Sequence, residues 1–100
     1  MIPYGQHSMD KDDIDAVVRT LKSNMITQGP LSPKFEERLA KKVESKYCAV
    51  VNSATSALHI SCLSLGLKAG DVMWTVPNSF VASANCGLYC GAKVDFVDID

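Results

Sequence analysis

Three short apolar segments, separated by two helical patterns, constrain the fold of this chain more than any other feature. The predicted strands are YCAVVN (47–52), DVMWTVP (71–77) and KVDFVDID (93–100). The predicted helices between them are TSALHISCLSLG (55–66) and SFVASANCGLYCG (79–91), with Gly66 and Gly91 expected to end them. Apolar strands that alternate with helices are typical of an α/β fold with a parallel sheet and right-handed crossovers.

Two further helices are predicted ahead of this alternation. Residues 10–24 place four apolar side chains on one helical face: Ile14, Val17, Val18 and Leu21. Acidic residues crowd the first turn of this helix and basic residues lie near its end, which suits the helix dipole. Ser32 followed by Pro33 is typical of a helix start, with Ser32 as N-cap and a helix that continues to about Ser45.

Composition bounds the class of protein. The chain has 100 residues, 47% of them hydrophobic and 21% charged, which is ordinary for one globular domain. Its net charge of −1 gives no electrostatic case for binding nucleic acid or an anionic membrane. The start of the chain has neither a basic region nor an apolar run typical of a secretory signal, so a cytoplasmic location is expected.

The predicted sheet looks unfinished. A parallel sheet is covered on both faces, yet the sequence stops at Asp100 as its third strand ends. Residues 1–100 are therefore expected to be the first, incomplete part of a larger domain, poorly folded and inactive alone.

The turn Asn52–Ser56 is the candidate ligand site, because it joins a predicted strand to the start of a helix. Small residues there let a phosphate approach the free N–H groups of the helix start. The same residues also suit a simple helix cap, and local sequence alone favours that alternative. Neither the G-x-G-x-x-G nor the G-x-x-x-x-G-K-[ST] pattern is present.

A zinc site is conceivable but weakly indicated. Its candidate ligands are His59, Cys62, Cys86 and Cys90. No C-x-x-C pair occurs, and buried cysteines usually behave as small hydrophobic residues, so no metal is expected.

Four motifs, in order, resemble one enzyme family: ITQGP, NSATSALH, TVPNSFVASAN and YCGAKVDFVDID. The chain resembles the N-terminal part of the DegT/DnrJ/EryC1/StrS nucleotide-sugar aminotransferases, which are fold-type-I pyridoxal 5'-phosphate (PLP) enzymes. The resemblance implies that residues 1–100 begin the PLP-binding large domain of a homodimer.

The resemblance also implies roles for individual residues. The PLP phosphate would be held by Ala54, Thr55 and Ser56, and the pyridine ring would stack on Phe80. Without the family, Phe80 is better interpreted as a core aromatic. The positions implied to contact the nucleotide-sugar are Tyr4, Asn24, Met25, Ile26, Thr27 and Ala54. The family's Schiff-base lysine is expected beyond residue 100, so no catalytic residue is assigned.

The implied reaction passes an amino group from a donor such as L-glutamate to C4 of a UDP-linked 4-keto-6-deoxy-N-acetylhexosamine, in pseudaminic acid biosynthesis. Three alternatives stay open. One is another nucleotide-sugar aminotransferase, and a second is a PLP-dependent sugar dehydratase of the same family, in which histidine replaces the lysine. The third is a non-catalytic α/β module that binds a nucleotide phosphate at the turn Asn52–Ser56.

Overall fold

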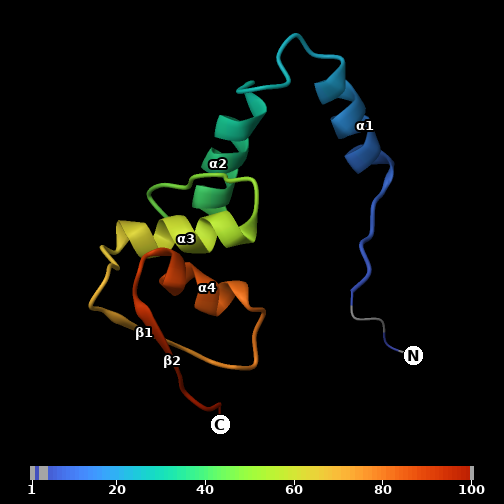
Figure 1. Cartoon of the computed structure of the whole chain (residues 1–100). Coiled ribbons are helices and arrows are strands. Elements are labelled where there is room, and N and C mark those ends of the chain that lie inside the picture. Colours follow the sequence, from blue (N-terminus) through green and yellow to red (C-terminus); the bar gives the residue numbers. More distant parts are fainter. Residues whose placement is uncertain (1, 3–4, 100) are drawn as a thin grey trace. The chain divides into compact units, whose positions relative to one another are not determined.

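The computed structural model describes residues 2 and 5–99 of the chain, which divides into two compact units. Unit 1 comprises Met1–Cys48 and unit 2 comprises Ala49–Asp100. Figure 1 shows helices α1 and α2 in unit 1, and helices α3 and α4 with strands β1 and β2 in unit 2. Among the helices of the described residues, none has the length and apolar content needed to cross a bilayer.

Helix α1 (Lys11–Leu21) begins at a capping box. Asp10 accepts hydrogen bonds from the backbone N–H groups of Asp12 and Asp13, at 2.9 and 3.1 Å. The Asp13 carboxylate in turn accepts from the Asp10 N–H at 3.2 Å. These bonds satisfy N–H groups that have no partner inside the helix. Acidic residues in the first turn and Arg19 in the last confirm the dipole pattern read from the sequence.

Helix α2 (Leu31–Lys42) begins one residue before the predicted N-cap. Its N-cap is Pro30, which makes no side-chain cap hydrogen bond, so the prediction of Ser32 as N-cap is wrong. Pro33 instead occupies the third helical position. A proline is tolerated there because N–H groups in the first turn have no helical acceptor in any case. The Ser-Pro pair therefore marks the first turn of the helix without fixing its first residue.

The connection between α1 and α2 is a tight turn around Gly29. Gln28 has a positive φ of 51°, and Gly29 is buried. A Cβ atom on Gly29 would lie 2.5 Å from the backbone oxygen of Met25. The Met25 carbonyl also accepts a hydrogen bond from the Ser23 hydroxyl at 3.2 Å. Only glycine fits this turn, since the contact is with backbone rather than with a movable side chain.

Unit 2 contains helix α3 (Ala54–Ser64), strand β1 (Val72–Thr75), helix α4 (Ala82–Tyr89) and strand β2 (Lys93–Phe96). The predicted glycine stops are confirmed: Gly66 and Gly91 follow the two helices with φ of 80° and 78°. Each belongs to a Schellman motif. In the first motif, for example, the Leu67 N–H donates to the Cys62 carbonyl at 3.1 Å.

The predicted strand 47–52 is not a strand in this structure. The described residues contain one sheet of two strands, and neither strand includes or pairs with this segment. Because a strand is held by hydrogen bonds to a neighbouring strand, an apolar run that no strand adjoins stays irregular. The sequence pattern indicated which residues suit a strand but not where the neighbouring strand lies.

Strands β1 and β2 form a parallel pair, as predicted, with Val72 opposite Lys93 and Thr75 opposite Phe96. Helix α4 packs on both strands, and α3 packs on α4. Gly87 lets α4 lie close to the sheet, because a Cβ there would meet the end of Met73 at 2.8 Å. The buried apolar residues of this unit are small: Ala82, Cys86 and Ala92.

Candidate functional site

The N-terminus of α3 presents a compact set of free hydrogen-bond donors. Within the described part of the chain, the N–H groups of Ala54 and Thr55 and the hydroxyl of Thr55 have no partner. The N–H groups of Ser56 and Ala57, by contrast, donate to Ser53 at 3.1 and 3.0 Å. Two free N–H groups and one hydroxyl at the positive end of a helix suit an anion such as a phosphate.

Ser56 differs from Thr55, although the two look alike in the sequence. Its hydroxyl donates to the side-chain oxygen of Asn52 at 2.7 Å. It also accepts from the hydroxyl of Ser53 at 3.0 Å. With its N–H bonded to Ser53 as well, both donors of Ser56 are engaged. The expected helix cap is therefore present, on Ser53, and it leaves the donors of Ala54 and Thr55 available. Cap and anion site are compatible rather than exclusive.

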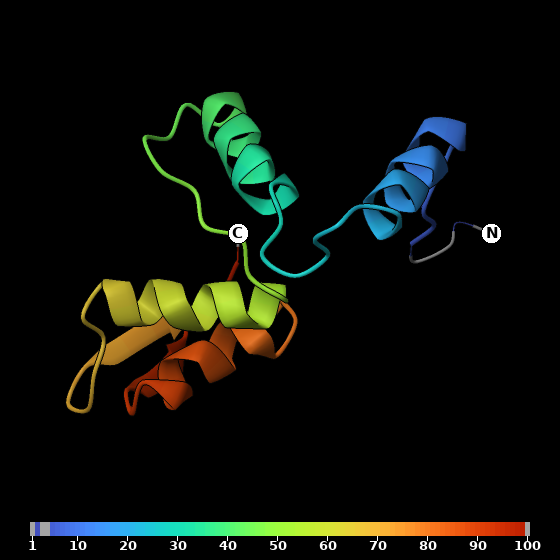
Figure 2. The same cartoon turned by 90° about the horizontal axis from the view of Figure 1, so that it is seen from above.

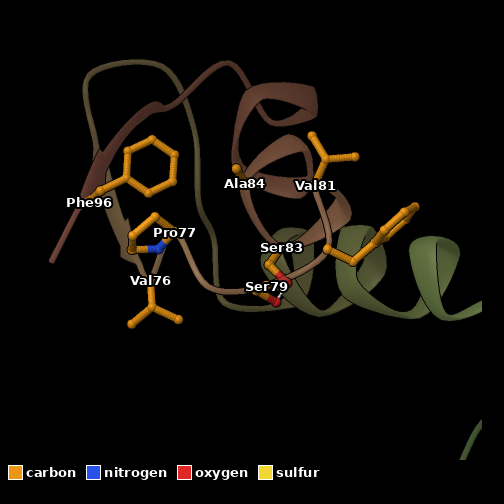
Figure 3. A pocket seen from close by; sticks show the side chains of 8 residues that line it. Val76, Pro77, Ser79, Val81, Ser83, Ala84 and Phe96 are labelled. Carbon is orange, nitrogen blue, oxygen red and sulfur yellow. Dashed lines mark hydrogen bonds between the residues drawn. The ribbon is translucent and has the colours of Figure 1, made fainter. Parts of the chain in front are cut away.

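A cavity of about 280 Å³ lies where β1 leads into α4. It is lined by Val76, Pro77, Ser79, Phe80, Val81, Ser83, Ala84 and Phe96. In Figure 3 Ser79 and Ser83 face each other across a hydrogen bond of 2.9 Å, and Pro77 and Phe96 lie together at the strand ends. The carboxyl ends of parallel strands are where open α/β sheets bind their ligands.

Phe80 is one of the residues that line this cavity, and its side chain is 75% exposed within residues 1–100. An exposed aromatic ring can stack on a flat ligand, a contact worth about 0.5–1.5 kcal/mol beyond its buried area. Whether Phe80 has this role or that of a core aromatic in the longer protein stays a prediction.

The two parts of the site lie at one edge of unit 2. In Figures 1 and 2 the N-terminal ends of α3 and α4 lie on the same side, which is also the side toward which β1 runs. The packing of α3 on α4 fixes this arrangement. The start of α3, with its free donors, and the start of α4, beside the cavity, therefore lie on the same side of unit 2.

The residues expected to contact the sugar substrate lie in unit 1, apart from Ala54. Asn24, Met25, Ile26 and Thr27 are all exposed in the turn between α1 and α2. Tyr4 lies outside the described residues. The roles of these positions stay predictions. What the structure adds is the closed turn at Gly29, which fixes the backbone of Met25.

Of the four candidate zinc ligands, the structure brings the thiols of Cys62, Cys86 and Cys90 near one another, while His59 has other surroundings. The His59 ring meets the Tyr89 ring edge-on, with centroids 5.3 Å apart. Cys86 is 3% exposed and donates to the Ser83 carbonyl at 3.4 Å, and Cys62 donates to the Met73 sulfur at 4.0 Å. Among the described residues no group of three or more His, Cys, Asp or Glu side chains is placed to hold a metal ion.

The Cys62 thiol is held in its neutral form. Burial, together with the neighbouring thiols of Cys86 and Cys90, raises the pKa of Cys62 from 9.0 to about 11. A thiol with so high a pKa is a poor nucleophile near neutral pH. Cys62 is therefore a packing residue at the contact between α3 and α4.

Ser83 and Phe96 line the cavity and were not predicted from the sequence, whereas Asn52 belongs to the predicted turn Asn52–Ser56. Asn52 ends the predicted first strand, and polar residues at strand ends are a signal for a ligand site in this fold class. Ser83 follows Ser79 by one helical turn, which is a weaker signal because serine pairs are common. The position of Phe96 at the cavity follows only from the register between β1 and β2, which the sequence does not specify.

Comparison with known proteins shows to which family the chain with this site belongs. Residues 7–100 match the DegT/DnrJ/EryC1/StrS aminotransferase family. The chain belongs to this family. A curated relative from Campylobacter jejuni subsp. jejuni serotype O:23/36, UDP-4-amino-4,6-dideoxy-N-acetyl-beta-L-altrosamine transaminase, is 44% identical over 99 residues. The match covers 99% of this chain and 26% of that relative.

Solved aminotransferases of this kind share the fold. Helicobacter pylori PseC, an aminotransferase of pseudaminic acid biosynthesis, has a TM-score of 0.91 at 38% identity, covering 98% of this chain and 27% of its own. The putative sugar aminotransferase Spr1654 from Streptococcus pneumoniae, in its PLP-form, has a TM-score of 0.91 at 31% identity, covering 99% and 25%. The predicted fold class, the N-terminal part of a PLP transferase of α/β type, is confirmed. The chain spans about a quarter of the length of these relatives.

Proposed function

We propose that the full-length protein is a PLP-dependent nucleotide-sugar aminotransferase. In this proposal it takes an amino group from an amino acid such as L-glutamate. It delivers that group to C4 of a UDP-linked 4-keto-6-deoxy-N-acetylhexosamine, in pseudaminic acid biosynthesis. The proposal is supported by family membership and by the names of the two relatives most relevant to the substrate. We propose also that the protein is cytoplasmic and acts as a homodimer.

The free donors at the start of α3 are the observation that carries the proposal. The phosphate of PLP carries a negative charge, and the N–H groups of Ala54 and Thr55 with the Thr55 hydroxyl supply three donors for it. The residues present therefore fit the phosphate. The exposed ring of Phe80 fits the pyridine ring, which needs an apolar or aromatic surface rather than a charge.

Each of these residues has a role that follows from its own chemistry. When bound, PLP supplies the electron sink for amino transfer. The α3 donors would anchor the cofactor at its phosphate. Phe80 would offer a flat apolar surface to the pyridine ring, beside the cavity lined by Val76, Val81 and Phe96. The lysine that would hold PLP covalently lies outside residues 1–100 in this proposal.

A direct assay of both products tests the activity. The full-length protein, loaded with PLP, is incubated with L-glutamate and the UDP-linked 4-keto sugar. We expect 2-oxoglutarate and the 4-amino sugar to form in equal amounts, as measured by mass spectrometry. Release of water from the sugar without consumption of glutamate would instead identify the dehydratase alternative. Binding of the nucleotide without either product would identify the non-catalytic module.

The Thr55→Asp variant tests the anchor separately from the reaction. A carboxylate beside the free N–H groups repels and replaces the phosphate, so we expect PLP affinity to fall by about a hundredfold or more. The apo-protein should keep its stability, because an acidic residue in the first turn suits the helix dipole. Ser61→Asp adds the same charge to the same helix away from its N-terminus and is the matched control. Normal PLP binding by Thr55→Asp would contradict the assignment.

A further inference from the structure

The proposed function does not explain the hydrogen bonds of the Ser56 hydroxyl. The sequence places it beside Thr55 in the phosphate turn, yet in this structure its hydroxyl proton goes to the Asn52 side-chain oxygen at 2.7 Å. The Ser53 hydroxyl lies 3.4 Å from that same oxygen. As long as the amide accepts from Ser56, the Ser56 proton is not available to a phosphate. Asn52 therefore decides whether the anion site has one hydroxyl donor or two.

Asn52 can release the Ser56 proton because an asparagine amide carries an acceptor on one side and two donors on the other. If the amide turns over, its NH₂ group donates to the Ser56 oxygen, which then directs its own proton outward. A phosphate that approaches the free N–H groups of Ala54 and Thr55 favours that arrangement, since a charged acceptor binds a hydroxyl proton more strongly than an amide oxygen does. No backbone movement is needed.

We propose that Asn52 is a positioning residue of the cofactor site, whose side-chain amide orients the Ser56 hydroxyl toward the PLP phosphate. The inference rests on the proposed function, because it concerns the same phosphate. It is supported by the three-residue network of Asn52, Ser53 and Ser56. Asn52 acts through Ser56 and does not itself touch the ligand.

The test uses pyridoxamine phosphate, which binds without a covalent bond to lysine, with pyridoxamine as the ligand that lacks the phosphate. Both are titrated into the full-length apo-protein by calorimetry. Asn52→Leu keeps the approximate size of the side chain and removes both amide groups. We expect it to weaken pyridoxamine phosphate about tenfold, the value of one charge-assisted hydrogen bond, and to leave pyridoxamine unchanged.

The same substitution in a Ser56→Ala background separates positioning from general damage. If Asn52 acts through Ser56, Asn52→Leu should then cost less than about twofold, since its target is gone. A tenfold loss in both backgrounds would overturn the proposal, as would tighter binding by Asn52→Leu, which would show that the amide only competes with the phosphate. Thermal unfolding of the apo-variants should differ little, because the Ser53 cap remains.

Asn52→Asp provides a second variant with a low risk of misfolding, because an acidic residue suits the start of a helix. Its carboxylate accepts from Ser56 as the amide does but cannot donate, so it keeps the Ser56 proton from the phosphate, and its negative charge also repels that phosphate. We expect a larger loss of pyridoxamine phosphate affinity than for Asn52→Leu, and unchanged pyridoxamine affinity. Wild-type affinity in this variant would overturn the proposal. If the wild-type protein instead bound pyridoxamine phosphate no more tightly than pyridoxamine, the proposed phosphate site itself would be overturned, and the inference with it.

Discussion

Helix α1 in unit 1 and helix α4 in unit 2 form for different reasons. Helix α1 carries its own start signal in the Asp10 capping box, charges that suit its dipole, and no buried residue. Helix α4 has only 8 residues, no side-chain cap and no charge in its end turns, but it buries three small residues. The first helix is specified by local sequence, and the second by the strands and helix on which it packs.

The difference shows where the chain depends on further contacts. Large apolar side chains are exposed in both units, including Val17 in α1 and Trp74 in β1. Helix α1 keeps its capping box and its charge pattern without further contacts, whereas α4 loses the surfaces on which it packs if β1 and β2 separate.

The largest expected effect is the loss of cooperative unfolding in residues 1–100 alone. The buried apolar side chains among the described residues are all small, so little free energy opposes the conformational entropy of the chain. We expect no cooperative thermal transition by calorimetry and no fixed aromatic environment by near-ultraviolet circular dichroism. The full-length protein at the same concentration is the control. A sharp transition of the monomeric segment would break the comparison, because α4 would then need no further contacts.

The next effect is in unit 1, where the backbone rather than packing is decisive. Gly29→Ala forces a methyl group against the Met25 carbonyl, and we expect it to destabilise the full-length protein by about 2–3 kcal/mol. Denaturant unfolding measures the change. Gly5→Ala is the matched control, because nothing lies within 4 Å of its Cβ position. Equal midpoints for the two variants would contradict the close contact at Gly29.

A third effect concerns the thiol between α3 and α4. Because the pKa of Cys62 is raised from 9.0 to about 11, its thiolate is scarce at pH 8.5. We expect iodoacetamide to label it in the full-length protein at least about tenfold more slowly than a cysteine in a short peptide, by mass spectrometry.

The same shift predicts a pH dependence. The folded protein binds the Cys62 proton more tightly than the unfolded chain, so the contribution to stability is present below pH 9 and is lost between about pH 9 and 11. Cys62→Ala should remove that slope from unfolding curves recorded across this range. Labelling at the rate of the peptide would show that α3 and α4 do not shield the thiol.

The smallest effect sharpens the account of α1. In a peptide of residues 6–24, Asp10→Ala removes the acceptor for two N–H groups and should cost about 1 kcal/mol of helix stability. Circular dichroism at 222 nm measures the loss of helix. Asp15→Ala, which leaves the capping box intact, should reduce helicity less, since its exposed ion pair with Lys11 contributes little. Equal losses would mean that charge, not capping, sets the start of α1.

The same division between local and distant causes explains what the sequence could predict. Helices with their own caps or stops, such as α1 and α3, were predicted to within a few residues, because Asp10 and Gly66 act on their neighbours. The segment 47–52 was predicted as a strand and is not one, since strand formation depends on a neighbouring strand that its own residues do not specify.

The candidate site shows the same limit. The sequence predicts the phosphate turn and the role of Phe80 through its resemblance to the family, whereas local residue patterns alone favour a helix cap and a core aromatic. It could not distinguish Thr55 from Ser56, because the difference lies in which hydroxyl Asn52 binds. Nor could it place Phe96 at the cavity, since that depends on the register between two strands.

That register also determines where this segment can gain or lose residues. The pairing of Thr75 with Phe96 brings both strands to the cavity at the same level, and the Val97 N–H donates to Thr75 at 2.9 Å just beyond it. Successive side chains of a strand alternate between its faces. One residue inserted within β2 would therefore replace the Phe96 ring at the cavity wall with the carboxylate of Asp95. An insertion in the turn at Lys68–Gly70 would leave every pairing in place, so natural length variation in this segment should collect there.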